Sequence, residues 1–171
     1  MSVRDAVPSD ADEVGRIQLT TWRTAYSGLV PDEILAGLSA AEHRERWASR
    51  LPAAPGAFCL VAGSPPVGFV SGGHLGDGAE IYALYVEPPA WRRGVGRALL
   101  AAGVARLRDA GATTAGLWVL RDNVPARSFY ESQGWAPTGE ARLEPMYGID
   151  LPVVRYATRL DAPRDAPRDA P

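Results

Sequence analysis

The sequence of 171 residues contains no lysine, because all 18 of its basic residues are arginine. Without lysine the chain can supply neither the cation of a Walker-type phosphate loop nor a Schiff base. Twenty acidic residues bring the formal net charge to −2 at pH 7, whereas nucleic-acid-binding surfaces are normally strongly basic. We therefore expect no nucleic-acid partner.

Cysteine and histidine are also scarce. The single Cys59 cannot form an internal disulfide, and a Cys/His zinc site is not expected with only His43 and His74 beside it. The composition therefore predicts no metal site and a reducing, cytoplasmic compartment.

Long apolar runs are missing too. The apolar stretch 98–105 lies between Arg97 and Arg106 and is too short to span a bilayer. The first residues lack the basic-then-apolar form of a signal peptide, and no G-x-S-x-G motif of an α/β-hydrolase occurs. We expect neither a membrane partner nor that hydrolase chemistry.

The chain ends in three copies of a short repeat, Asp-Ala-Pro with Arg after the first two, over residues 161–171. The repeat has no large apolar residue, and its regular prolines are incompatible with a helix. We predict one domain over residues 1–160, followed by a disordered tail.

Within that domain, apolar periodicity and turn residues alternate along the chain. Asp10 with Glu13, and Ser39 with Glu42, have the spacing of helix capping boxes. Strands are predicted at 3–7, 57–62, 67–71, 79–87, 113–119, from 135 and at 153–158. With helices after residue 8, after Pro31, at 94–110 and at 124–133, the order is β-α-α-β-β-β-α-β-α-β-β. This order predicts an α/β (α+β) domain with a mostly antiparallel sheet, flanking helices and one βαβ crossover.

The segment Trp91–Arg97 carries the clearest chemical signal. It places Gly94 and Gly96 between a predicted strand and a predicted helix, where main-chain N–H groups can turn toward an anion. Five arginines and no acidic residue lie between Trp91 and Arg108, which favours a diphosphate ligand. The alternative is an ordinary helix N-terminus with solvated arginines. A Rossmann dinucleotide site fits poorly, because Leu99 stands where its third glycine would be.

The chain resembles the GCN5-related N-acetyltransferases (GNAT family) in two motifs. Their V-x-P strand end and Q/R-x-x-G-x-G/A loop are similar to Leu84–Pro88 and Gly94–Gly96, and their N-x-x-A-x-x-F-Y motif followed by G-F/W is similar to Asn123–Trp135. The resemblance covers residues 3–160 and implies the GNAT fold, with its mixed, mostly antiparallel central sheet. Trp91 departs from the pattern, because the family has Gln or Arg there.

The resemblance implies acetyl-CoA as co-substrate, threaded between strands 79–87 and 113–119, which separate to form a cleft. Main-chain groups of Leu84 and Val86 would bind the pantetheine arm. The implied diphosphate cradle is Arg92, Arg93, Gly94, Val95, Gly96 and Arg97, and the implied cofactor contacts on the next motif are Asn123, Ala126 and Tyr130. Asn123 is also expected to cap its helix.

The resemblance also implies direct acetyl transfer to an amine in a ternary complex, without an acyl-enzyme. Tyr130 matches the residue that protonates the leaving thiolate, and Glu80 stands where many members place the base, with His74 as the alternative. Cys59 then needs no chemical role and is expected to be a packed core thiol.

The acceptor is expected to be a primary amine of a small molecule or peptide. Trp22 and Tyr26, with Trp47, are candidates for an aromatic wall, and Asp32 and Glu33 for attracting a cationic amine. A non-catalytic acyl-CoA-binding module and an unrelated nucleotide-phosphate binder are the alternatives. Dimers are common in the family, so the resemblance also allows a homodimer.

Overall fold

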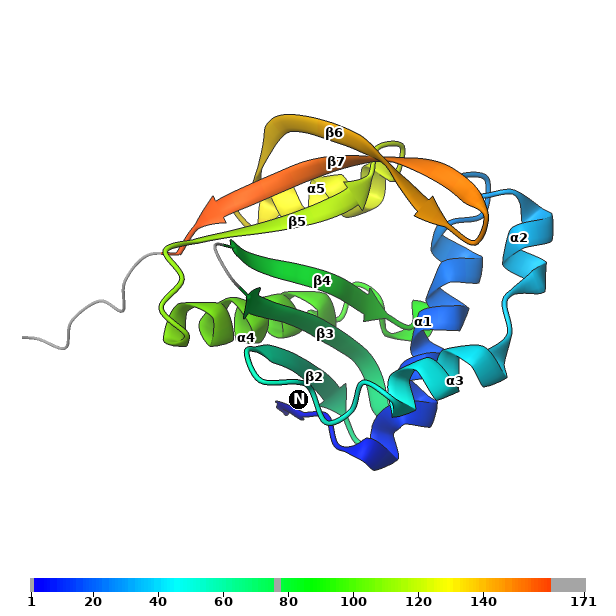
Figure 1. Ribbon diagram of the computed structural model, residues 1–171, viewed down its shortest axis with the longest axis horizontal. Helices are drawn as coiled ribbons and strands as arrows, with labels where there is room; N and C mark the ends of the chain where they lie inside the picture. Colours follow the sequence, from blue (N-terminus) through cyan, green and yellow to red (C-terminus); the bar gives the residue numbers. More distant parts are fainter. Residues whose placement is uncertain (1, 76–77, 161–171) are drawn as a thin grey trace, which may run out of the picture.

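The computed structural model describes residues 2–75 and 78–160. Seven strands form one sheet in the order β1-β2-β3-β4-β5-β7-β6, with every pair antiparallel except β4–β5 (Figure 1). The strands are β1 (Val3–Asp5), β2 (Ala57–Gly63), β3 (Pro66–Leu75), β4 (Gly78–Val86), β5 (Thr114–Leu120), β6 (Ala136–Met146) and β7 (Ile149–Arg159). The predicted fold class is confirmed. The predicted disorder of the tail at 161–171 lies outside the described residues.

The helices before β2 differ from the prediction in number. Three of them are present, α1 (Ala11–Ala25), α2 (Asp32–Gly37) and α3 (Ala40–Ala48), where two were expected. Leu38 and Ser39 are extended and separate α2 from α3. Ser39 Oγ accepts a hydrogen bond from the Glu42 main-chain N–H at 3.3 Å and so begins a new helix, as its cap spacing predicted.

The predicted capping box at Asp10 is wrong. The Asp10 carboxylate turns away from α1, accepting the Val7 main-chain N–H at 2.8 Å and pairing with Arg4 at 2.7 Å. It therefore stabilises the 3₁₀ turn over Pro8–Asp10 that precedes the helix. The Arg4 guanidinium also lowers the pKa of this carboxyl group.

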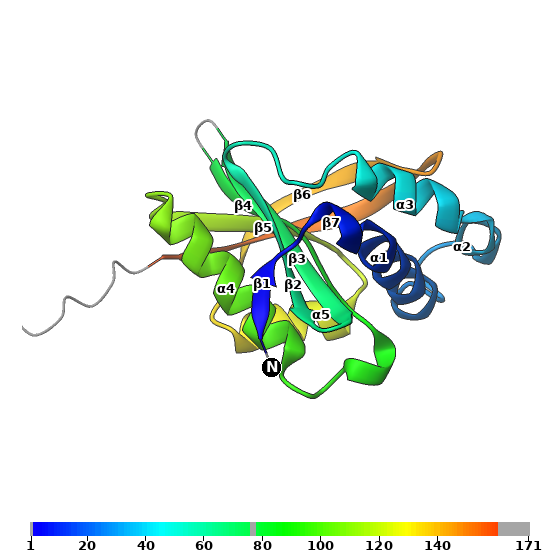
Figure 2. The same cartoon turned by 90° about the horizontal axis from the view of Figure 1, so that it is seen from below.

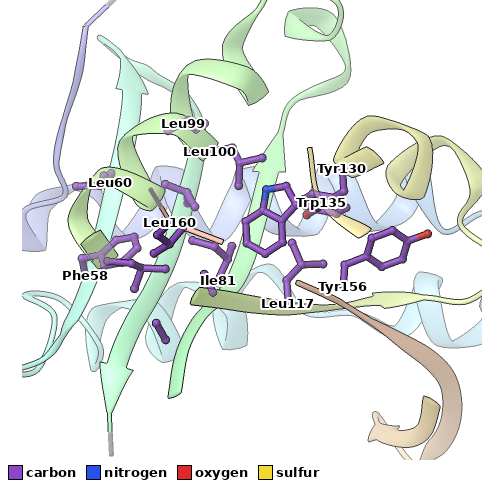
Figure 3. Close-up of a cluster of buried hydrophobic side chains, with 14 of the residues drawn as sticks. Phe58, Leu60, Ile81, Leu99, Leu100, Leu117, Tyr130, Trp135, Tyr156 and Leu160 are labelled. Carbon is purple, nitrogen blue, oxygen red and sulfur yellow. The ribbon is translucent and has the colours of Figure 1, made fainter. Parts of the chain in front are cut away.

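Helices cover both faces of the sheet. The helix α4 (Val95–Asp109) packs on one face of β2, β3 and β4, and α1 and α3 lie on the other (Figure 2). The core under α4 extends to α5 (Val124–Ser132) through Leu99, Ile81, Leu117 and Tyr130 (Figure 3). On the opposite face, Trp47 of α3 packs edge-on against Phe69 of β3.

The strands β4 and β5 pair only near their N-terminal ends, Glu80 with Gly116 and Ile81 with Leu117, and then diverge (Figure 1). A bulge precedes the divergence, because Ser71 pairs with Ala83 and Gly72 with Ile81, leaving Tyr82 as the extra residue. Gly72 is required opposite this bulge, since a Cβ there would lie 2.6 Å from the Glu80 carbonyl oxygen. The bulge thus bends β4 away from β5 and opens the sheet.

Candidate active site

A cleft of about 1510 Å³ occupies the opening between β4 and β5 and continues to the first turn of α4 and to α5. Most of the residues expected from the sequence line it. They are Tyr26, Glu80, Leu84, Val86, Arg92, Gly94, Val95, Gly96, Arg97, Asn123, Ala126 and Tyr130. Segments far apart in the sequence therefore contribute to one continuous site.

Other expected residues lie elsewhere. Arg93, alone in the predicted diphosphate cradle, does not line the cleft. Trp22 lines an adjacent cavity, which is described below, together with Trp47. His74 and the acidic pair at 32–33 line neither space, and the acidic pair is solvent-exposed in the first turn of α2.

The loop before α4 presents main-chain donors to the cleft. Gly94 has φ +80°, a left-handed conformation that glycine adopts without strain, and it precedes the first residue of α4. No side chain caps this helix, so the N–H groups of Val95, Gly96 and Arg97 are available to a ligand. Together with the positive end of the helix dipole, they form a site for an anion.

Cations remain available around this loop. Arg106 pairs with Asp5, and Arg108 lies 3.9 Å from Asp109, so both are engaged along α4. Within the part of the chain that the structure describes, Arg92 and Arg97 form no ion pair. Both line the cleft, where their charges add to those of the helix N-terminus.

Trp91, which stands where the family pattern has Gln or Arg, has a structural role that the sequence did not indicate. The Trp91 indole N–H donates to the Val86 carbonyl at 2.6 Å, and the Thr21 hydroxyl donates to the same oxygen at 3.1 Å. These two bonds tie the loop and α1 to the end of β4. No local sequence signal connects Trp91 with a carbonyl five residues earlier.

The edge of β4 facing the cleft is open. The Glu87 N–H donates to Val67 on β3, and residues of a strand alternate in direction, so the main-chain groups of Leu84 and Val86 point away from β3. The Val86 carbonyl is already occupied by Trp91 and Thr21. Of the main-chain groups expected to bind a pantetheine arm, the N–H and carbonyl of Leu84 and the N–H of Val86 therefore remain free.

Tyr130 of α5 combines burial with access to the cleft. It is 9% exposed, packs beside Phe129 and lines the cleft. Its ring also lies beside Trp135 (Figure 3). Burial, and to a smaller extent the nearby Tyr85, raise the pKa of its phenol well above the usual value. The hydroxyl therefore stays protonated at neutral pH and can donate a hydrogen bond. Asn123 accepts the Ala126 N–H at 3.2 Å and caps α5, as predicted.

Glu80 is a half-buried carboxylate on β4 and lines the same cleft. Burial raises its pKa above the usual value for a glutamate, while Arg155 and Arg142 act in the opposite direction and Glu144 adds to the increase. A carboxylate with a raised pKa is a stronger base toward an ammonium group. The geometry therefore favours Glu80 over His74, which lies outside the cleft near the Ala110 carbonyl.

A second cavity of about 370 Å³, here called the α3 cavity, lies next to the cleft. It is lined by Gln18, Trp22, Arg46, Trp47, Arg50, Ser71, Tyr82, Ala83, Tyr85, Pro145, Met146 and Tyr147. Tyr147 belongs to the β6–β7 turn, where it has φ +49° and Gly148 has φ +81°. Two successive positive φ angles are typical of a type I′ hairpin, so the turn places the Tyr147 side chain against α3.

A chain of hydrogen bonds holds the wall of this cavity. Trp47 Nε1 donates to Gln18 Oε1 at 2.8 Å, and His43 Nδ1 lies 3.1 Å from the same oxygen, so Nδ1 carries the proton. His43 Nε2 then accepts from the Tyr147 hydroxyl at 3.2 Å. That hydroxyl accepts in turn from Arg46 Nη1 at 3.1 Å.

This hydrogen-bond network requires His43 to be neutral, because its Nε2 accepts a hydrogen bond. Burial, reinforced by Arg46, lowers its pKa below 6.5, so protonation favours the unfolded chain and stability falls as pH drops below about 6.5. We expect the melting temperature to fall more between pH 7.5 and 5.5 in the wild type than in His43→Asn, which cannot titrate. An equal fall in both proteins would contradict the hydrogen-bond assignment.

Cys59 is 5% exposed, and burial raises its pKa to about 12, so it is a core thiol as expected. Among the described residues, no three His, Cys, Asp or Glu side chains gather as metal ligands would. No helix in ranges 2–75 and 78–160 has the length and apolarity to cross a membrane.

The chain is similar in sequence to known acetyltransferases. Residues 19–135 match the acetyltransferase (GNAT) family. The chain is 32% identical over 138 residues to YuaI, an uncharacterized N-acetyltransferase of Bacillus subtilis, covering 77% of this chain and 78% of YuaI. Mycothiol acetyltransferase of Nocardiopsis dassonvillei is 44% identical over 68 residues, but that match covers 38% of this chain and only 21% of that protein.

Solved structures show the same fold. A GCN5-related N-acetyltransferase from Rhodopseudomonas palustris has a TM-score of 0.76 at 26% identity, covering 93% of this chain and 95% of that one. YncA of Salmonella typhimurium, solved with its cofactor acetyl-CoA, has a TM-score of 0.68 at 19% identity and covers 99% of both chains.

Proposed function

This chain is an acetyl-CoA-dependent N-acetyltransferase of the GNAT family, and we propose that it transfers the acetyl group directly to a primary amine of a small molecule or peptide. One observation carries the proposal: a single cleft joins an anion-binding helix N-terminus to a protonated phenol and a half-buried carboxylate. Direct transfer within a ternary complex agrees with the burial of Cys59, which leaves no thiol nucleophile in the cleft.

The residues of the cleft fit coenzyme A along its length. The N–H groups at the start of α4, with Arg92 and Arg97, would hold the diphosphate. The open edge of β4 at Leu84 and Val86 offers main-chain partners for the amide groups of a pantetheine arm, as an added strand would use them. Acetyl-CoA supplies an activated thioester carbonyl next to this edge.

Glu80 would then act as the general base and Tyr130 as the general acid. Glu80 accepts a proton from the acceptor ammonium, which frees the amine to attack the thioester carbonyl. The new C–N bond forms as the C–S bond breaks, and Tyr130 donates its proton to the departing sulfur. The second proton that the nitrogen loses on becoming an amide then restores the Tyr130 phenol, and Glu80 releases its proton to solvent. Fixed main-chain donors orient the carbonyl and stabilise the negative charge that develops on its oxygen.

Glu80→Gln is expected to lower kcat/KM by about 10²-fold at neutral pH, a typical contribution of a general base. The deficit should shrink as pH rises, because the acceptor amine then loses its proton to solvent. Glu144→Gln is the matched control, since it removes an equal charge from the same cleft. A deficit that is constant across pH would mean that Glu80 is not the base.

Calorimetric titration with acetyl-CoA, with NAD and ATP as controls, tests the proposal without knowledge of the acceptor. We expect saturable one-site binding of acetyl-CoA alone, followed by thiol release with members of an amine panel. Binding of ATP or NAD in preference would favour the nucleotide-phosphate alternative. Binding of acetyl-CoA without turnover of any amine would favour a non-catalytic module.

A further inference from the structure

The α3 cavity meets the acetyl-transfer cleft at the β4 bulge. Tyr82, Ala83, Tyr85 and Met146 line both spaces. An amine positioned beside the bulge would therefore extend the rest of its molecule into the α3 cavity. At about 370 Å³, this cavity has room for a small polar group with a short carbon chain.

Every charged side chain that lines the α3 cavity is cationic. Arg46 and Arg50 line it, no carboxylate does, and neither arginine has an ion-pair partner within residues 2–75 and 78–160. The cleft on the other side of the bulge carries both signs of charge, but its carboxylate Glu80, two residues before the bulge at Tyr82, forms no ion pair among the described residues. The α3 cavity therefore offers only cations, whereas an unpaired carboxylate lies close to the bulge.

The remaining polar groups include a further free donor. Trp22 is only 4% exposed and lines the cavity, and its indole N–H has no hydrogen-bond partner among the described residues. A buried donor without a partner is unfavourable, and an acceptor atom on a ligand would remove that cost. This donor and the N–H groups of the two guanidinium groups can all bind acceptor atoms of a ligand.

The cation is also held in position before any ligand binds. Arg46 Nη1 donates to the Tyr147 hydroxyl, which is anchored in turn by buried His43. The other N–H groups of Arg46 make no hydrogen bond within the described chain and remain available. Arg50 lies over the Trp47 ring, 5.7 Å from its centroid. Both guanidinium groups are therefore supported on aromatic side chains at the rim.

Building on the proposed function, we infer that the acceptor is a primary amine bearing a carboxylate, which the α3 cavity binds through Arg46 and Arg50. A guanidinium fork matches the two oxygens of a carboxylate. The acceptor amine would lie at the bulge, near Glu80, and its carboxylate would lie in the cationic cavity. An amino acid, or a peptide with a short acidic side chain near its amino group, has this charge pattern.

Matched acceptor pairs test this inference. Each carboxylate-bearing amine is compared with its neutral carboxamide by thiol release, in the wild type, Arg46→Gln and Arg50→Gln. We expect the wild type to favour the carboxylate members by tenfold or more in kcat/KM, and each substitution to remove about tenfold of that preference. Rates with neutral members and the dissociation constant for acetyl-CoA should change less than about twofold. Arg44→Gln is the control, because Arg44 lies on α3 but lines neither space and is exposed.

A second readout needs neither acetyl-CoA nor turnover. The indole N–H resonances of Trp22 and Trp47 in ¹⁵N-labelled protein should shift on addition of the carboxylate amines and not of the carboxamides. Equal use of both members, a preference that survives both substitutions, or no indole shift with any carboxylate amine would overturn the inference. Failure to bind acetyl-CoA while the indole signals still shift would count against the proposed function alone.

Discussion

Gly94→Glu is expected to abolish detectable binding of acetyl-CoA while the protein remains folded. The new carboxylate would stand at the N-terminus of α4, where an acidic group is attracted to the same free N–H groups that would hold a diphosphate. It would also repel the phosphates of the ligand. The Cβ itself would meet no atom within 4 Å, so no clash compromises folding. Calorimetric titration measures the loss, and circular dichroism checks the fold.

Two controls separate charge from backbone strain in this experiment. Gly111 also has a positive φ, +92°, and open space around it, but it lies beyond the C-terminal end of α4. Gly111→Glu therefore introduces the same side chain and similar strain away from the cleft, and should bind acetyl-CoA normally. Gly94→Ala retains the strain without the charge and should weaken binding only modestly. An unchanged dissociation constant in Gly94→Glu would exclude this loop as the diphosphate site.

The order of strands and helices was predictable because local residues mark most boundaries. Gly63 to Pro66 separate two apolar runs, Pro88 ends a strand, and Gly111 follows a helix. The break at Leu38–Ser39 was marked by the cap spacing of Ser39 and Glu42, but the region after Pro31 was still read as one helix, because the six residues of α2 are too few to show a helical period of their own. The capping role predicted for Asp10 was wrong because the turn brings Arg4 close, and the carboxylate pairs with that guanidinium instead of with the N–H groups of α1.

The lining of the part of the cleft that we propose for acetyl-CoA was predictable for a similar reason. Gly94–Gly96 and Asn123–Tyr130 are contiguous motifs whose residues act within one or two turns of chain. Only the detail of neighbouring side chains was beyond the sequence. Arg92 lines the cleft and Arg93 does not, because the loop reverses direction at Arg92, which has φ +59°.

The α3 cavity, which we propose for the amine acceptor, could not be predicted from contiguous motifs. The α3 cavity is assembled from α1, α3, β4 and the β6–β7 turn, and contacts such as that of Arg46 with Tyr147 join residues 101 positions apart. The aromatic residues Trp22 and Trp47 were singled out, but the acidic pair at 32–33 was expected to set the charge. The structure instead places two arginines at this cavity, which reverses the sign of the ligand group expected there.

Tyr130→Phe is expected to lower kcat by about 10²-fold or more, within the range of a positioned acid, with little effect on the affinity for acetyl-CoA. The change removes one oxygen atom and leaves the ring in its contacts with Phe129 and Trp135, so the core should remain intact. What is lost is the hydrogen bond to the leaving sulfur, a contact that gains strength only as negative charge develops there. Steady-state kinetics and calorimetry together distinguish this result from a loss of binding.

Tyr156→Phe provides the matched control for that experiment. Tyr156 is fully buried in the same cluster (Figure 3). Its hydroxyl donates to Glu131 and accepts from Arg127, and it does not line the cleft. Removal of the Tyr156 hydroxyl should lower stability with little effect on kcat. Tyr130→Phe should lower kcat with little effect on stability. Burial keeps the pKa of Tyr130 well above 10, so its titration should produce no fall in kcat up to about pH 10. Equal kcat values in Tyr130→Phe and the wild type would reduce Tyr130 to a packing residue and leave the departing sulfur to solvent.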